Sequence, residues 1–397
     1  MGSTNKTNGS YLGRLSNFFS PSKIALGVNA AKTVGTEAKS LGARKVLIVT
    51  DPGVVKAGLV DGIRQALLAE KIEVGLYDKV ELETPARVID ECVAVARTGG
   101  FQLIVGLGGG TTLDTAKGVA LLATNKGSVL DYVGMELAPT KALPKIQIPT
   151  TGGSGSEITR VFALTDEGAK TKTIVYSFYN LAEVVILDPA LTVSLPPSLT
   201  ADTGMDALGH AIEAYVSVNG TPFSDLLALE AIRLVSENLL AAYAKGENMA
   251  ARYNMLLAAS LAGLAWASGG LGAAHALSYT LETEHQIGHA RAIALILPYI
   301  MEYNKIGNLA KFGRIASVMG ESTEDMSASE AADRAVAAVK KLLDALNISI
   351  RLSDYGVSAQ HIDRLVEGAM KQARLFVPNP RNLTEDDVRM LYVRALG

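Results

Sequence analysis

The chain has 397 residues, of which 48% are hydrophobic and 19% are charged, and its formal net charge is −3 at pH 7. This length exceeds the size at which one hydrophobic core stops growing, so we expect two domains. So small a charge gives no reason to expect a nucleic acid or an acidic membrane as a partner. The longest apolar runs, such as residues 292–301, contain proline or are too short to span a bilayer.

The chain begins with a polar segment, MGSTNKTNGS, that lacks the apolar stretch of a secretory signal. We therefore expect a cytoplasmic protein with a flexible tail at residues 1–15. The one cysteine, Cys92, lies among valines and alanines at helical spacing, where a buried small apolar side chain is the favoured role. A single cysteine permits no internal disulfide, no structural zinc lobe and no thiolate-bound catalytic zinc.

Strand and helix patterns alternate in the first half of the chain. The continuous apolar run at 45–50 is followed by helical spacing up to residue 70, and strand 73–78, helix 86–97 and strand 101–107 repeat the unit. Continuous apolar strands are typical of a sheet that is covered on both faces. The pattern predicts a nucleotide-binding α/β domain with a parallel, doubly wound sheet over residues 16–195. Further strands are expected between residues 145 and 189, and their pairing, parallel or partly antiparallel, stays open.

Strand patterns end after Asp188-Pro189, where a segment rich in proline and serine follows. Alanine-rich and leucine-rich segments with helical spacing then occupy residues 203–217, 224–245, 248–267, 272–284, 289–305, 309–318, 328–346 and 359–372. This composition predicts an almost entirely helical second domain over residues 196–397.

Two glycine-rich loops follow predicted strands. The first, Gly108-Gly109-Gly110, leads into helical spacing from Thr112 onward, so backbone amides and a helix N-terminus could hold a diphosphate. Its spacing is not GxGxxG, and tight packing of strand against helix is the alternative reason for the glycines. The second loop, PTTGGSGSE at 149–157, offers hydroxyls and amides to a nicotinamide, a ribose or a diphosphate, or is an ordinary loop. Two such loops in one sheet favour a nucleotide crevice.

Asp51 directly follows the first predicted strand. In that position a carboxylate can accept hydrogen bonds from an adenosine ribose and would repel a 2′-phosphate, which favours NAD over NADP. The alternative role is to initiate the turn at Pro52-Gly53.

Four residues could surround one divalent cation: Asp206, His210, His275 and His289. The chain has only five histidines, and three of them belong to this set. Asp206 and His210 are four residues apart, so both leave the same face of one helix. Neutral imidazoles suit zinc, iron, cobalt or nickel, and a single carboxylate leaves the site with about one positive charge, as a Lewis acid requires. Each histidine alone would be interpreted as a helix residue satisfied by hydrogen bonds, but the set favours a metal.

The motifs GGGTTLDTAK, PTTGGSGSE and DTGMDALGHAIEAY, with histidines at 275 and 289, together resemble the iron-containing (group III) alcohol dehydrogenase family over about residues 20–397. The resemblance implies the architecture shared with dehydroquinate synthase, with the active site in the cleft between two domains, and a homodimer or higher homo-oligomer. It implies hydride transfer between a small alcohol or aldehyde and NAD(H), with Fe²⁺ or, less often, Zn²⁺ as the metal.

By resemblance, the metal ligands are the same four residues, and Trp266 lies at the substrate pocket, with core packing as the alternative. Cofactor contacts are implied for Asp51, Gly109, Gly110, Thr111, Asp114, Thr150, Thr151, Ser154, Lys172 and Leu199. Without the resemblance, Lys172 would be interpreted as a solvated charge.

The sequence departs from the family where many relatives have a further histidine for proton transfer, because Tyr279 occupies that position here. Tyr279 and His285 therefore join His275 and His289 as candidate catalytic residues, and water with cofactor hydroxyls is another route for the proton. Arg291 could attract an anionic substrate tail or form a surface ion pair.

Two other functions are considered. A dehydroquinate synthase-like metal-dependent lyase would need several lysines and arginines around a phosphate, and the helical segments near the histidines show no such cluster. A non-catalytic NAD-binding protein would leave the metal site unused. Metal analysis beside an NADH absorbance assay distinguishes the three.

Overall fold

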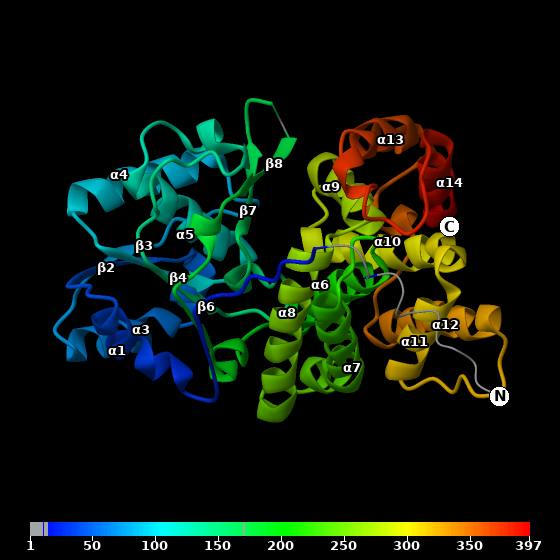
Figure 1. The fold of residues 1–397 in the computed structure, drawn as a ribbon, viewed down its shortest axis with the longest axis horizontal. Coiled ribbons are helices and arrows are strands. Elements are labelled where there is room, and N and C mark those ends of the chain that lie inside the picture. The colour runs from blue at the N-terminus through cyan, green and yellow to red at the C-terminus, as the bar shows by residue number, and fades with distance from the viewer. Residues whose placement is uncertain (1–10, 12–14, 170) are drawn as a thin grey trace.

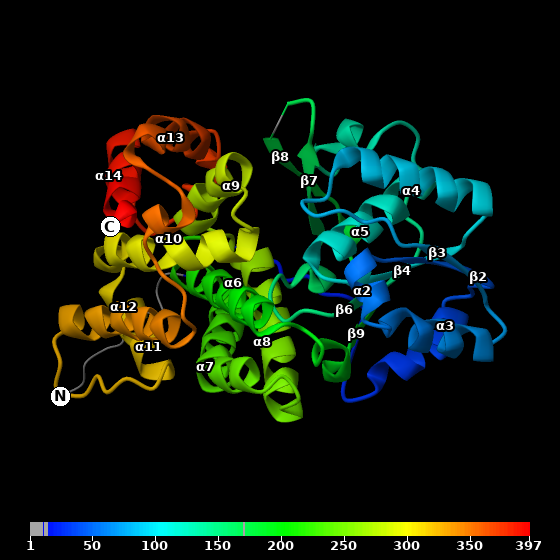
Figure 2. The same ribbon diagram turned by 180° about the vertical axis from the view of Figure 1, so that it is seen from behind.

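The computed structural model describes Tyr11 and residues 15–169 and 171–397, and most of the tail expected at residues 1–15 lies outside these ranges. A sheet covered by helices forms one half of the molecule and a cluster of helices forms the other (Figure 1). The same two halves appear from behind in Figure 2, with α6 and α8 next to the sheet half in both views. This arrangement confirms the predicted fold class.

The larger sheet has six strands in the order β1-β9-β6-β4-β2-β3, and every pairing in it is parallel. Its strands are β1 (Lys23–Leu26), β2 (Lys45–Val49), β3 (Glu73–Tyr77), β4 (Leu103–Gly108), β6 (Lys145–Pro149) and β9 (Val184–Leu187). Central strands such as β4 are buried along their whole length, because helices pack on both faces. The covering helices are α1 (Val34–Ser40), α2 (Pro52–Lys56) and α3 (Leu59–Ala69), and α4 (Ala86–Gly99) and α5 (Gly110–Thr124).

The strands expected between 145 and 189 divide between two sheets. Strands β6 and β9 join the parallel sheet, whereas β7 (Val161–Asp166) and β8 (Thr171–Tyr176) form an antiparallel pair in a small second sheet with β5 (Gly134–Met135). The antiparallel pair carries residues of the second sheet toward the helical half, as the label β8 shows in Figure 1.

Some local predictions were wrong. The helix expected up to residue 70 is broken, because Gly58 takes a left-handed conformation with φ 73° between α2 and α3. The helix expected from Thr112 begins at Gly110. Strand β1 and helices α1 and α14 were not predicted.

Helices make up the second half, and no strand occurs among residues 196–397, all of which are described. They are α6 (Pro197–Val216), α7 (Pro222–Ala244), α8 (Met249–Gly269), α9 (Ala273–His285), α10 (His289–Asn304), α11 (Leu309–Val318), α12 (Ala328–Ala345), α13 (Ile362–Met370) and α14 (Glu385–Leu396). Short 3-10 helices occupy Ala30–Thr33, Val129–Tyr132, Ser156–Ile158, Phe178–Asn180, Pro189–Thr192, Lys305–Gly307, Leu352–Tyr355, Ala359–His361 and Ala373–Leu375.

The second glycine-rich loop is seated on α8. Gly155 has a φ of 63°, and a Cβ there would lie 2.7 Å from the Cα of Gly263, so only glycine permits this close approach. Glu157 in the same loop accepts a 2.8 Å hydrogen bond from Ser260. The loop thus joins the sheet to the helical half.

Cys92 is fully buried in α4, as predicted, and burial raises the pKa of its thiol well above the ordinary value. In the described part of the chain, no single helix is long and apolar enough to cross a membrane, although α8 and α9, bent by 109° at their break, meet that test as a pair.

Candidate metal centre and its cleft

The four predicted ligands come together from three helices. Asp206 and His210 lie one turn apart on α6, His275 lies near the start of α9, and His289 is the first residue of α10. One possible ligand atom from each residue lies within 4.8 Å of the others. Among the described residues, no other group of three or more His, Cys, Asp or Glu side chains is arranged so that it could hold a metal ion.

The spacing of these atoms fits a shared cation better than direct hydrogen bonds. Asp206 Oδ1 lies 3.6 Å from His210 Nδ1 and 3.7 Å from His289 Nε2, beyond the usual hydrogen-bond range. Two ligands about 2.1 Å from one ion at a tetrahedral angle would be separated by about 3.4 Å. Asp206 Oδ1, His210 Nδ1 and His275 Nε2 are also buried without a hydrogen-bond partner, which is costly unless a cation binds them. The residues present therefore fit a divalent metal.

Burial sets the protonation state of the central imidazole. It lowers the pKa of His210 to about 4, against the opposing effect of Asp206. A neutral imidazole is the form that binds a metal, so His210 is ready to act as a ligand at neutral pH.

Glu213 fixes the orientation of His275. Its carboxylate lies 2.6 Å from His275 Nδ1 and accepts backbone N–H bonds from Gly272 at 2.9 Å and Ala274 at 2.6 Å. Burial opposes a charge on Glu213, but His275 and these N–H groups outweigh it and lower the pKa of Glu213. With Nδ1 engaged, His275 Nε2 points to the cluster.

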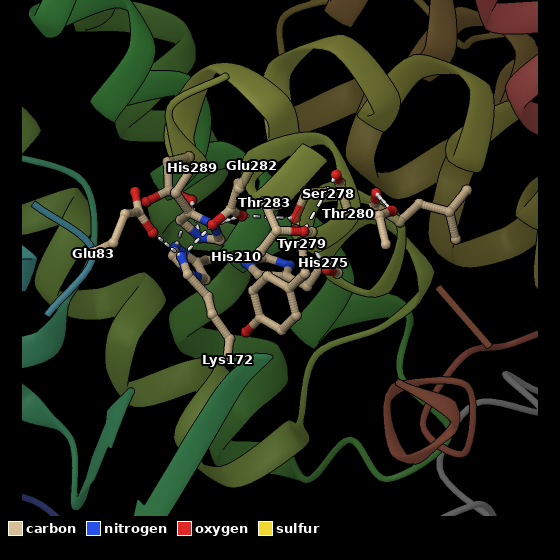
Figure 3. Close-up of polar contacts among 12 residues, drawn as sticks. Glu83, Lys172, His210, His275, Ser278, Tyr279, Thr280, Glu282, Thr283 and His289 are labelled. Atoms are coloured by element: carbon tan, nitrogen blue, oxygen red, sulfur yellow. Dashed lines mark hydrogen bonds and ion pairs between the residues drawn. The ribbon is translucent and has the colours of Figure 1, made fainter. Parts of the chain in front are cut away.

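Glu282 has the corresponding position beside His289. Glu282 Oε1 lies 2.5 Å from His289 Nδ1, and Oε2 pairs with Lys172, which also pairs with Glu83 (Figure 3). Burial favours neutral Glu282, but His289 and Lys172 outweigh it and lower its pKa to about 2. Lys172 keeps only 12% of its side chain exposed, so interpreting it as a solvated charge was wrong.

The cluster lies in a cleft of about 1810 Å³ between the sheet and the helical half. The glycine-rich loops line the sheet side, and α6, α9 and α10 line the other. The cleft is also lined by every residue for which cofactor contact was predicted, namely Asp51, Gly109, Gly110, Thr111, Asp114, Thr150, Thr151, Ser154, Lys172 and Leu199. A single cavity therefore brings together the two predicted groups of residues.

Asp51 and Asp114 in this group also have structural partners. Asp51 caps α2 by accepting from Gly53 at 2.9 Å and Val54 at 3.1 Å, and it accepts a bond from Thr112 at 2.8 Å. Its expected role in the turn is therefore present, and its carboxylate still lines the cleft.

Asp114 accepts a 2.9 Å bond from the backbone N–H of Ala163 and also pairs with Ser156 and with Lys117. This network ties α5 to the second loop and to β7. Lys117 is fully buried, and sequence inspection did not single it out.

The remaining candidates surround the metal centre. Trp266 stacks on His210 with ring centroids 5.8 Å apart, so it both packs and lines the cleft. Tyr279 lies 5.8 Å from the His289 ring, and burial raises its pKa to about 12. His285, at the end of α9, lines the cleft and packs against His361 at 4.7 Å.

Arg291 is neutralised rather than free. It donates to Asp202 at 2.6 Å and to Tyr355 at 3.0 Å, although it lines the cleft. The ion pair expected as one alternative for this residue is therefore present.

Sequence reasoning missed the two carboxylates beside the histidines. Glu213 is three residues after His210, and Glu282 is seven after His275, so each lies on the same helical face as a predicted ligand. That periodicity was a usable signal. It does not reveal which histidine each carboxylate meets, because Glu213 contacts His275 on another helix.

Comparisons with known proteins agree with this geometry. A family model described as iron-containing alcohol dehydrogenase matches residues 21–189, and one described as Fe-containing alcohol dehydrogenase family, C-terminal, matches residues 200–396. The chain is 41% identical to long-chain-alcohol dehydrogenase 1 of Geobacillus thermodenitrificans, covering 94% of each chain. It is 34% identical to NAD-dependent methanol dehydrogenase of Bacillus methanolicus, over 96% of this chain and all of the relative.

The fold is similar to that in a crystal structure of 1,3-propanediol oxidoreductase. The TM-score is 0.94 at 37% identity, with 96% of this chain and 100% of that chain covered.

Proposed function

This chain belongs to the iron-containing alcohol dehydrogenase family and is an NAD-dependent oxidoreductase that acts on alcohols or aldehydes, and we propose that its cleft binds NAD(H), one divalent metal and a small alcohol. The carrying observation is the set of unpartnered ligand atoms on Asp206, His210 and His275, which face the same cavity as the two glycine-rich loops. Because of the family assignment, we prefer a dehydrogenase to the dehydroquinate synthase-like lyase and to the non-catalytic NAD-binding protein.

We assign the metal to Asp206, His210, His275 and His289. When bound, the cation would polarise the oxygen of the alcohol or aldehyde, and the nicotinamide would accept or supply the hydride. Glu213 and Glu282 hold the Nδ1 atoms of His275 and His289, which leaves both Nε2 atoms for the cation. Trp266, stacked on His210, would give the substrate an apolar wall.

We place the cofactor diphosphate at the N-terminus of α5. Gly109 is the N-cap of that helix and supplies no side chain, so the first N–H groups stay open to a ligand. Thr150, Thr151 and Ser154 border the same cavity and would contact the nicotinamide half.

We propose a preference for NAD over NADP, supported by the fixed carboxylate of Asp51 in the cleft. We propose Fe²⁺ as the resident metal and Zn²⁺ as a possible substitute, supported by the three-imidazole, one-carboxylate ligand set and by the family.

Proton exchange is assigned to His285 rather than to Tyr279. Burial and then His361 lower the pKa of His285, so its imidazole is free to accept a proton through water in the cleft. Tyr279, with its pKa raised to about 12, would instead donate a hydrogen bond and exclude water.

We place the domain boundary near residue 195, between β9 and α6. A homodimer or a higher homo-oligomer and a cytoplasmic location stay predictions. Light scattering of the purified protein would test the first, and fractionation of cells that produce it would test the second.

The experiment for the function is an anaerobic, NADH-linked screen of small alcohols and aldehydes with Fe²⁺ and Zn²⁺ added separately to metal-free protein. We expect turnover that depends on the added metal and exceeds any turnover with NADPH. Equal turnover without metal would contradict the assignment of the four ligands.

A further inference from the structure

Glu282 joins the metal centre to the opposite side of the cleft. It lies two turns after His275 on α9, and only 2% of its side chain is exposed. One carboxylate oxygen meets His289 Nδ1 at 2.5 Å and accepts a 3.5 Å bond from Ser278, and the other pairs with Lys172. The first oxygen therefore has its partners on the helical side, and the second has its partner on the sheet side (Figure 3).

Lys172 comes from β8, 110 residues earlier in the chain, and lies between two carboxylates. Glu83, in the segment between β3 and α4, is the partner on its own side of the cleft, and Glu282 is the partner across it. Burial disfavours a charged lysine, but Glu282 and then Glu83 outweigh it and raise the pKa of Lys172 above its ordinary value. The charged ammonium therefore bridges the two halves in this structure.

Glu213 shows what a purely local arrangement looks like. It orients His275 while being held by backbone N–H groups of Gly272 and Ala274, in the same half of the molecule. Glu282 has no such backbone donors within the residues that the structure describes: besides the long 3.5 Å bond from Ser278, it is held by Lys172 from the sheet half.

We propose that Glu282 is a positioning residue that makes retention of the metal depend on the contact between the two halves, by orienting His289 while Lys172 holds it. The proposal rests on the assignment of His289 as a ligand. Lys172 would then serve the metal centre in addition to any contact with the cofactor. Loss of the bridge would release the Glu282 carboxylate to turn, and His289 would lose its fixed direction.

The test is the affinity for Zn²⁺ of metal-free full-length protein, measured by competition with a chromogenic chelator. Glu282→Gln keeps the size of the side chain and removes its charge. We expect it to weaken Zn²⁺ binding by about 10- to 100-fold, as loss of such a partner does at other metal sites. The visible absorption of bound Co²⁺ should shift as well, because the field of the His289 ligand changes.

Glu83→Gln is the matched control, since Glu83 contacts the same ammonium but not His289. We expect it to change Zn²⁺ affinity by about twofold or less. Lys172→Met should weaken Zn²⁺ binding less than Glu282→Gln does. The double variant Lys172→Met/Glu282→Gln should lose no more than Glu282→Gln alone, because both changes break one chain of contacts.

Equal losses of Zn²⁺ affinity in Glu83→Gln and Glu282→Gln would overturn the proposal, as would wild-type affinity in Glu282→Gln. A lower melting temperature of metal-free Glu282→Gln with unchanged Zn²⁺ affinity would also overturn it, in favour of a structural ion pair. Failure of the proposed function is distinct, because it would appear as weak Zn²⁺ binding by the wild type or unchanged binding in His275→Ala.

Discussion

His275 and His289 both have a buried glutamate on Nδ1, but the two glutamates are held by different parts of the molecule. Glu213 accepts from the backbone at the start of α9, whereas Glu282 pairs with Lys172 from β8. Backbone donors are fixed by the helix itself, whereas a lysine from the other half of the molecule holds Glu282 only while the two halves stay in contact. The pair of Glu213 and His275 is thus held locally, whereas the pair of Glu282 and His289 depends on the position of the two halves.

This difference divides the metal centre into two parts. Asp206, His210 and His275 are buried in the helical half, while 29% of the His289 side chain is exposed toward the cleft. We expect the first three ligands to be preformed and the fourth to respond to movement of the sheet half. Cleft closure of that kind is the usual way in which an enzyme excludes water from a two-domain site.

The largest effect is expected from His275→Ala, which removes a ligand from the rigid part. Turnover should fall by about a thousandfold or more, since the cation supplies several kcal/mol of charge stabilisation. NAD binding, measured by titration calorimetry, should persist because the glycine-rich loops are untouched. Full turnover in metal-stripped variant protein would contradict the ligand assignment.

Glu213→Gln should affect both the metal and the fold. It places an amide against two backbone N–H donors, so metal-free protein should lose about 1 to 3 kcal/mol in the free energy of unfolding. Zn²⁺ affinity should also fall by about 10- to 100-fold. Urea unfolding of metal-free protein gives the first quantity, and chelator competition gives the second.

For metal-free Glu282→Gln we expect a smaller loss in the free energy of unfolding than for Glu213→Gln, because no backbone donor is left unpaired. A Glu282→Gln loss as large as that of Glu213→Gln would remove the distinction between a locally held and a cross-cleft carboxylate.

Asp51→Ser tests a carboxylate on the sheet side of the cleft that, like Glu213, is held by backbone N–H groups of its own half of the molecule. Serine can still cap α2, so folding should be kept while the negative charge is lost. We expect the ratio of kcat/KM for NADP to that for NAD to rise by about tenfold, since repulsion of a 2′-phosphate ends. An unchanged ratio in steady-state assays would show that Asp51 serves α2 alone.

The smallest effect is expected from a change of pH on the free energy of unfolding of the metal-free protein. The pKa of Glu282 is lowered from 4.5 to about 2, so its stabilising contribution is complete above about pH 4.5 and is lost as the pH falls toward 2. Against the effect of burial, Glu282 also raises the pKa of His289, so loss of the His289 proton reduces the difference in stability between wild type and Glu282→Gln at higher pH. Urea unfolding of the two proteins should therefore be compared in acid, where the difference is expected to be large near pH 4.5. That difference should shrink below it, and a difference that grows in acid would contradict the cause assigned here.

Much of the fold followed from local pattern. Continuous apolar strands predicted a sheet covered on both faces, and helical spacing located all the helices after residue 195 except α14, whose first turn is acidic. Strand β1 has only four residues, half of them exposed, and so gave no clear signal. The break at Gly58 was missed because the apolar spacing continues across it.

The metal set was accessible from the sequence because histidines are few and Asp206 and His210 share a helical face. The partners of those ligands were not, because spacing along one helix does not say what lies opposite. Glu213 meets His275 across 62 residues, and Lys172 meets Glu282 across 110.

The sequence by itself thus determined which side chains can bind a cation and which loops can approach a phosphate, since residue type and helical period fix both. Only the tertiary structure decided that one imidazole is oriented from within the helical half and another through a lysine across the cleft. The reason is that short-range electrostatic contacts depend on how separate elements pack, and that packing leaves no periodic trace in either segment.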